Sequence, residues 1–290
     1  HDSYGGSTES SPVLGESFYK FEKVYDTGRG NTDYLTNLIS TSDGGFIAVG
    51  RSDLGSGSYP LDAVVMKVDQ FGALEWSSWF GNTDSNERVS SVVEAGNGDF
   101  IMTGHLDNGS DQDIIVARYT SGGTALWAKL YNYNTLLDGS ADGLDYGRAV
   151  YEDSASGNIY IYGAGNVHSD GSYWNPILMI LDSSGSYVDG QYWYWDSGDY
   201  AQSSAYFQSV DHSPSFGDEM VHIEIYNQTL SQWEGSVAYT NASDPTAAFS
   251  WIDYYDMDID DVKRYGNWHS IYGNAVAVSY THLRAHETFA

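Results

Sequence analysis

Residues Ser42–Asn82 read SDGGFIAVGRSDLGSGSYPLDAVVMKVDQFGALEWSSWFGN and contain the pattern from which the fold can be predicted. A Gly/Asp turn is followed by an apolar strand that ends at Gly50, a polar loop, and a second apolar strand that begins at Asp62. A glycine turn and a third strand, which contains Trp76, complete the stretch. Because the first two strands lack the polar–apolar alternation of a half-exposed sheet, we expect both of their faces to be covered.

The same order of features recurs twice more. Residues Gly96–Asn132 read GNGDFIMTGHLDNGSDQDIIVARYTSGGTALWAKLYN, and residues 156–195 contain SGNIYIYG, NPILMILDSSG and YVDGQYWYW. The glycines that end the first strand of each copy, Gly50, Gly104 and Gly163, lie 54 and 59 residues apart. This spacing is long enough for one unit of four short strands in each copy.

An additional short strand precedes each copy, at Leu35–Ile39, Val89–Glu94 and Ala149–Glu152. Each repeat therefore has four strands separated by Gly, Asp, Asn and Ser turns. Four-stranded antiparallel units at this period predict an all-β fold, a β-propeller of four-stranded blades. An antiparallel solenoid and a tandem β-sandwich are the alternative architectures.

We predict about four blades and part of a fifth within residues 17–277. The fourth copy is degraded (SSAYFQSV, DEMVHIEIYN, WEGSVAYT, AAFSWIDYY), and a fifth starts at residue 260 and stops, so we expect truncation at the C-terminus. Residues 17–28 (SFYKFEKVYDTG) match an outer strand, which would close the ring by pairing with the last blade. Residues 1–16, rich in Gly, Ser and Thr, predict an extended N-terminal arm.

The patterns DGGFIAVG, DAVVMKVDQFG and LEWSSWFG resemble SBBP-type β-propeller repeats, which occur in secreted and surface proteins, chiefly of microbes. The resemblance extends from Phe18 to Trp195 and is faint from there to Ala277. It implies a propeller scaffold outside the cell and no shared catalytic residues.

The last residues differ from the rest of the chain. Residues 278–288, VSYTHLRAHET, resemble a translated sequencing adapter, so we expect 278–290 to be a non-native tail on a gene assembled from metagenomic reads. His282 and His286 have the i, i+4 spacing of two zinc ligands on a helix. We assign no zinc site to them because of the adapter resemblance.

Composition narrows the classes of partner. The chain has 40 Asp and Glu against 12 Lys and Arg, a net charge of -28, which disfavours nucleic acid as a partner. No apolar run approaches the roughly 20 residues of a membrane helix, so no membrane insertion is expected. The opening HDSYGGSTESSPVLG predicts a mature extracellular N-terminus left after leader removal, with an arbitrary boundary as the alternative. Sequons at Asn108, Asn227 and Asn241 predict N-glycosylation.

Calcium is the one cofactor that the acidic residues suggest. Asp256, Asp258 and Asp260 alternate, so on a strand their carboxylates would share one face and repel unless a hard cation lay between them. The acidic loops at 107–113 and 138–145 also offer oxygen ligands. Solvated acidic turns without a cation are the alternative for all three clusters.

No catalytic motif stands out, and the chain has no cysteine nucleophile. The 25 Tyr, 9 Trp and 10 Phe suit blade cores, sugar-stacking surfaces or subunit interfaces. We predict a non-catalytic extracellular structural or adhesive protein, the repeating subunit of a surface filament or sheath. Its expected partners are copies of itself, other surface proteins and glycans. The alternatives are a carbohydrate-binding propeller module of a surface protein and an extracellular hydrolase.

Overall fold

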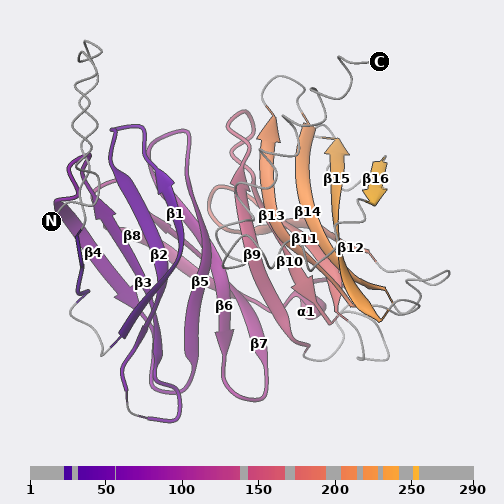
Figure 1. Ribbon diagram of the computed structural model, residues 1–290, viewed down its shortest axis with the longest axis horizontal. Helices are drawn as coiled ribbons and strands as arrows, with labels where there is room; N and C mark the ends of the chain where they lie inside the picture. Colours follow the sequence, from indigo (N-terminus) through magenta and orange to yellow (C-terminus); the bar gives the residue numbers. More distant parts are fainter. Residues whose placement is uncertain are drawn as a thin grey trace, which may run out of the picture.

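The computed structural model describes residues 23–27, 32–55, 57–137, 143–166, 174–193, 204–213, 218–227, 231–241 and 251–254. These residues form four antiparallel sheets of four strands each, and the sheets follow one another in sequence order (Figure 1). Within each sheet, every strand pairs with the strand that precedes or follows it in the chain. The fold is thus the predicted all-β propeller, and each sheet is one blade.

The strands of each blade run outward from the innermost to the outermost. Their bounds are, for blade 1, β1 Thr32–Ser40, β2 Phe46–Asp53, β3 Leu61–Val68 and β4 Leu74–Phe80; for blade 2, β5 Asn86–Glu94, β6 Phe100–Asp107, β7 Gln112–Tyr119 and β8 Ala125–Tyr131; for blade 3, β9 Asp145–Glu152, β10 Ile159–Gly165, β11 Asn175–Leu181 and β12 Tyr187–Tyr192; and for blade 4, β13 Ala205–Ser213, β14 Asp218–Asn227, β15 Gln232–Asn241 and β16 Trp251–Tyr254. A five-residue helix, α1 (Tyr133–Leu137), follows blade 2. No helix of the described ranges could span a bilayer.

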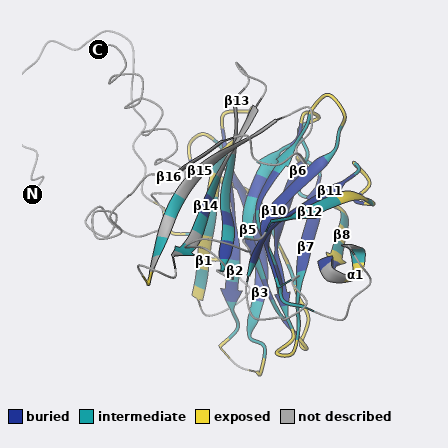
Figure 2. Cartoon of the chain, turned by 90° about the vertical axis from the view of Figure 1, so that its right-hand side faces the viewer, coloured by how far each residue is buried: buried dark blue, intermediate teal, exposed yellow. Residues whose placement is uncertain are grey.

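The middle strands of blades 1 to 3 are buried on both faces, as the sequence predicts (Figure 2). Three apolar clusters lie at the three junctions between successive blades. They centre on Val65 and Met102 between blades 1 and 2, Ile114 and Ile161 between blades 2 and 3, and Tyr162 and Phe207 between blades 3 and 4. The core is therefore a set of blade-to-blade interfaces, so each blade depends on its neighbours for burial.

The repeat glycines are explained by a β-bulge in each inner strand. Gly50 pairs with Leu35 just before a register shift in β1, and Gly104 pairs with Val89 in the same way in β5. At this shift the two backbones approach so closely that a methyl group on Gly104 would collide with the carbonyl oxygen of Arg88. The landmark that defines the repeat is thus a steric requirement of the close backbone approach beside the bulge in blades 1 to 3, whereas Ile223 holds the corresponding position in blade 4.

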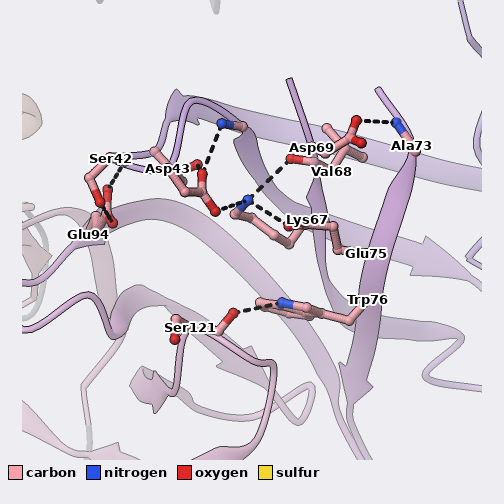
Figure 3. Close-up of polar contacts among 12 residues, drawn as sticks. Ser42, Asp43, Lys67, Val68, Asp69, Ala73, Glu75, Trp76, Glu94 and Ser121 are labelled. Carbon is pink, nitrogen blue, oxygen red and sulfur yellow. Dashed lines mark hydrogen bonds and ion pairs between the residues drawn. The ribbon is translucent and has the colours of Figure 1, made fainter. Parts of the chain in front are cut away.

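Blades are also joined by charged side chains at the end where the inner strands finish. In Figure 3 the Lys67 ammonium lies between the carboxylates of Asp43 and Glu75, at 2.8 Å from each. The neighbouring blade reaches this turn through Glu94, whose carboxylate accepts hydrogen bonds from the backbone N–H and hydroxyl of Ser42, at 2.7 and 2.6 Å. These bonds tie the first turn of blade 1 to the inner strand of blade 2.

Blade 2 repeats this arrangement with arginine in place of lysine. Arg118 pairs with Asp99 at 2.9 Å and with Glu152 of blade 3 at 3.4 Å. Glu152 also accepts a hydrogen bond from the backbone N–H of Gly96, at 2.7 Å. Glu152 therefore joins blades 2 and 3, because its carboxylate pairs with Arg118 and accepts a hydrogen bond from the turn at Gly96.

Residues 23–27 form no strand, yet they contact blade 1 as an outer strand would. Lys23 and Tyr25 both donate hydrogen bonds to the carbonyl of Gly72, at 2.9 and 2.7 Å. Lys129 and Tyr131 of β8 donate in the same way to the carbonyl of Gly185 in blade 3, at 3.0 and 2.6 Å. The match supports the predicted likeness of this segment to an outer strand, and closure of the ring by it stays a prediction.

The inner strand of blade 1 has no blade before it among the described residues. Leu38 of β1 is 62% exposed, whereas Val92 and Val150, at the equivalent positions of β5 and β9, are 4% and 5% exposed. Of the other predicted segments, the arm 1–16 and the tail 278–290 lie outside the described residues.

Candidate functional site

The candidate site lies at the end of the propeller where inner strands β1, β5, β9 and β13 begin. In blades 1 to 3 the residue directly after the repeat glycine pairs across the sheet with an inner-strand residue. In blade 4 the equivalent position is held by Glu224, which follows Ile223, so four equivalent pairs lie in one layer. These pairs are Tyr34–Arg51, Arg88–His105, Tyr146–Ala164 and Tyr206–Glu224. Two of the four pairs contribute an arginine to the layer.

A third arginine reaches this layer through a bulge. Arg148 is the residue of β9 left without a pairing partner at the register shift between Gly147 and Ala149. A bulge re-aims the extra side chain, so the same irregularity that requires the repeat glycine also places this guanidinium. We call the end of the propeller that carries Arg51, Arg88 and Arg148 the arginine face.

The three arginines make no ion pair within the described part of the chain, where Lys67 and Arg118 are the residues that do. The Nε atoms of Arg88 and Arg148 are buried and have no hydrogen-bond partner among the described residues. Burial, together with the positive charge of Arg51, lowers the pKa of Arg88. The arginine face therefore concentrates positive charge in a strongly acidic protein.

His105 lies beneath these arginines as a neutral imidazole. It is 6% exposed, and burial together with the charges of Arg88 and Arg148 lowers its pKa to about 3. Its ring contacts the Tyr146 ring edge-on, with 4.5 Å between the centroids. His105 therefore adds no charge to the face at neutral pH, and its role is to support Tyr146.

A row of half-buried aromatic rings begins at Tyr146 and crosses from blade 3 to blade 4. The centroids of Tyr146, Trp174, Tyr206 and Trp233 are separated in turn by 4.8, 5.8 and 5.3 Å. The Arg148 guanidinium lies over the first ring, 5.2 Å from its centroid. Such rings have an apolar body and a polar tip. They suit ligands that have both apolar and hydrated polar parts.

Two half-buried carboxylates belong to the same end of the propeller. Asp107 is the last residue of β6, and its Oδ1 accepts a hydrogen bond from the backbone N–H of Gly109, at 2.8 Å. Glu224 pairs with Tyr206 in the layer described above and accepts a hydrogen bond from Gln208, at 2.7 Å. The face thus contains arginines, aromatic rings and two carboxylates.

A second pair of carboxyl groups is buried between blades 1 and 2. Asp62 is fully buried and Glu87 is 3% exposed, and a methyl group on Gly81 would contact both carboxylates. Glu87 accepts a short hydrogen bond from the Ser85 hydroxyl, at 2.5 Å, and borders a cavity of about 190 Å³. Burial, with a smaller contribution from Asp62, raises the pKa of Glu87 to about 7.

This raised pKa predicts that stability falls as the pH rises. Because Glu87 binds its proton more tightly in the folded state, its contribution is present below about pH 4.5 and is lost as the pH rises to about 7. Glu87→Gln removes the ionisation and keeps an acceptor for Ser85, so we expect it to stabilise the protein by about 2 kcal/mol at pH 8 and not at pH 4.5. Urea unfolding at both pH values measures this. The exposed Asp84→Asn is the charge-matched control, and equal effects of the two variants at pH 8 would contradict the prediction.

The predicted glycosylation and calcium sites lie elsewhere. Asn108 is exposed in the turn after β6, where its side-chain oxygen accepts hydrogen bonds from the backbone N–H groups of Ser110 and Asp111, at 3.0 and 2.8 Å. Asn227 and Asn241 end strands β14 and β15, and their side chains are outside the described residues. Glycosylation of all three stays a prediction.

The alternating acids Asp256, Asp258 and Asp260 are outside the described residues. The described part of the chain contains no group of three His or acidic residues arranged to hold a metal ion, and this includes the acidic loop at 107–113. The loop acids instead accept bonds within their turn, as Asp107 does from Gly109. Calcium binding by the alternating acids stays a prediction.

Comparison with solved structures supports the architecture. The chain is similar to a variant of an α-L-arabinofuranosidase from Fusarium graminearum in complex with an iminosugar inhibitor, with 10% identity, a TM-score of 0.51, and coverage of 78% of this chain and 68% of the other. A native arabinanase from Bacillus subtilis matches with 11% identity, a TM-score of 0.41, and coverage of 73% and 72%. The Dos1 propeller matches with 11% identity, a TM-score of 0.40, and coverage of 78% and 61%. No family model and no curated relative matches the sequence.

These matches correct the functional prediction. The expectation of a non-catalytic structural subunit of a filament or sheath was wrong, because it treated the propeller as an inert scaffold, whereas a solved structure that shares this fold is an α-L-arabinofuranosidase. The expectation that the chain is not an enzyme fails for the same reason. The likeness itself establishes the fold.

The arginine face was missed at the sequence level, although the sequence contains a signal for it. When the repeat glycines are aligned, Arg51 and His105 fall at the same position, one residue after Gly50 and Gly104. A polar residue at the end of a buried strand, repeated at one level, indicates a shared surface at that end. No local motif or spacing defines the group, so single motifs do not reveal it.

Proposed function

We propose that this propeller is a carbohydrate-active protein that binds and hydrolyses a glycan on the arginine face. The observation that carries the proposal is the row of four half-buried rings that starts beneath Arg148 and crosses two blades. Aromatic rings pack against the apolar faces of sugar rings, while flanking polar groups bond to the hydroxyls. The arabinofuranosidase that shares the fold supports a saccharide ligand.

Hydrolysis of a glycosidic bond needs two carboxyl groups on opposite sides of it. Asp107 and Glu224 are the half-buried acids of the arginine face, and they come from blades 2 and 4. We assign them this role: one protonates the leaving oxygen, and the other activates water or attacks the sugar carbon. The two acids therefore define the first variants to examine.

The finer predictions from the sequence fit this proposal. An SBBP-type repeat would supply the scaffold, and the site would be built from residues near the strand ends of that scaffold. An extracellular location suits a protein that meets polysaccharides, and the sequons would then carry glycans on loops such as that of Asn108.

The proposal predicts that Trp174→Ala weakens glycan binding about fivefold to thirtyfold, because it removes the second ring of the row and about 1–2 kcal/mol of stacking. Affinity electrophoresis against a panel of soluble plant, fungal and bacterial polysaccharides identifies the ligand and measures the loss. Trp79→Ala, on outer strand β4, is the matched control and keeps wild-type affinity.

Release of reducing ends from the bound polysaccharide tests the catalytic part of the proposal. Asp107→Asn and Glu224→Gln are expected to bind it and to lose more than 99% of the hydrolysis. Full hydrolysis by both variants would remove these acids from the mechanism. If the wild-type protein retains no polysaccharide of the panel, the proposed function fails.

A further inference from the structure

Basic side chains are scarce in this protein, with 12 Lys and Arg against 40 Asp and Glu, so their placement is informative. Most of the basic side chains in the described ranges have a local use. Lys67 and Arg118 form ion pairs with carboxylates, and Lys23 and Lys129 donate to backbone carbonyls. The remaining three, which are Arg51, Arg88 and Arg148, gather on the arginine face and form no ion pair within the described residues.

This concentration of positive charge is unfavourable in the free protein. Arg88 is partly buried next to the like charge of Arg51, and its Nε lacks a hydrogen-bond partner among the described residues. Burying an uncompensated charge is costly, and with so many carboxylates in the chain a partner would be easy to supply. An anion that binds from outside would compensate these charges.

The nearby carboxylates do not serve as that partner. Asp107 is close enough for its charge to influence His105 and Arg88, but no ion pair joins it to an arginine. Glu224 instead accepts a bond from Gln208. His105 is buried beside the same arginines. Its neutral imidazole carries no negative charge, so it cannot compensate them.

We propose that the arginine face binds an acidic saccharide, whose carboxylate or sulfate groups are held by Arg51, Arg88 and Arg148 while its sugar rings pack on the aromatic row. The position of Arg148 links the two halves, because its guanidinium lies over the ring of Tyr146 that begins the row. A ligand that uses both must carry an anionic group directly on a sugar ring, as uronic acids and sugar sulfates do. Guanidinium groups bind such oxyanions with paired hydrogen bonds.

This inference rests on the proposed function and specifies its substrate class. A long polyanion such as nucleic acid would be repelled by the net charge of -28. A short acidic oligosaccharide contacts only the cluster of Arg51, Arg88 and Arg148. At 0.15 M salt the charges beyond about 8 Å are screened, so the arginines next to the ligand dominate.

The test compares four saccharides by isothermal titration calorimetry in 0.15 M NaCl. They are oligogalacturonate, its methyl ester, a chondroitin sulfate oligosaccharide and a neutral galacto-oligosaccharide. We expect at least one acidic saccharide to bind ten or more times as tightly as the uncharged ones. The preferred acidic saccharide then identifies the anion as carboxylate or sulfate.

Arg51→Gln and Arg148→Gln are each expected to weaken acidic-saccharide binding at least tenfold and to weaken the binding of uncharged saccharides by a clearly smaller factor. Lys129→Gln, on outer strand β8, makes the same charge change away from the face and is expected to have no effect. Thermal unfolding of the three variants shows that each is folded. Arg88→Gln is added as a third variant of the face when it unfolds at the wild-type temperature.

Two results would overturn the inference, and they are distinguishable. Equal binding of the uronate and its methyl ester, with no loss in the arginine variants, would show that charge is not recognised, and the proposed function would stand. Absence of binding to every saccharide, acidic or neutral, would remove both the inference and the proposed function.

Discussion

Arg118→Met is expected to lower the free energy of unfolding by about 3 kcal/mol, measured by urea unfolding at pH 7. The Arg118 side chain is 9% exposed, and its partners Asp99 and Glu152 are 15% and 9% exposed. Methionine fills the space but leaves both carboxylates poorly hydrated and without their countercharge. Because Glu152 also holds the turn at Gly96, its displacement would loosen the junction between blades 2 and 3.

Lys67→Met is the matched control, because Lys67 occupies the equivalent position in blade 1. Its partners Asp43 and Glu75 are 57% and 43% exposed, so their carboxylates return to water when the lysine is lost. We expect a loss of at most about 1 kcal/mol. Equal losses in the two variants would show that burial of the carboxylates is not the deciding factor.

Gly104→Ala is expected to destabilise the protein by about 2–3 kcal/mol, the upper part of the range for overpacking in a rigid core. A Cβ at this position would collide with the backbone of Arg88 and Val89, which cannot yield as a flexible side chain does. The strain acts on the backbone of Arg88, which belongs to the arginine face, so saccharide binding is expected to fall as well. Urea unfolding and calorimetric titration measure the two effects.

Gly122→Ala is the control for this variant. The nearest atom to its Cβ is the Thr120 hydroxyl, at 3.9 Å, so the added methyl group has room. We expect a change within about 0.5 kcal/mol. If Gly104→Ala destabilised the protein as little as Gly122→Ala, the predicted collision of a Cβ at Gly104 with the backbone of β5 would be contradicted.

Much of the fold was predictable from sequence because the repeat is visible in it. The apolar strands at 46–50 and 63–66 and the turns between them recur in each copy, and period and strand count together specify a four-stranded blade. Burial of both faces followed from the missing alternation. The degraded fourth copy was also located correctly, as strands β13 to β16.

The candidate site was much less predictable. Arg51, Arg88 and Arg148 are separated by 37 and 60 residues, and no motif links them. Their meeting depends on the order of blades around the propeller and on the bulge that re-aims Arg148. The functional prediction failed for the same reason, since it relied on the absence of local catalytic motifs.

The sequence by itself determined the repeat, the four-stranded blade, the buried middle strands and the strongly acidic charge. These are local properties, because strand, turn and burial follow from residues a few positions apart. Which of the scarce cations form ion pairs, and which do not among the described residues, follows only from the folded arrangement of the blades. That distinction depends on distances between side chains, because Arg118 forms an ion pair with Glu152 of the next blade, whereas Arg88 lies near Arg51, Tyr146, His105 and Asp107 and forms no ion pair with a described residue.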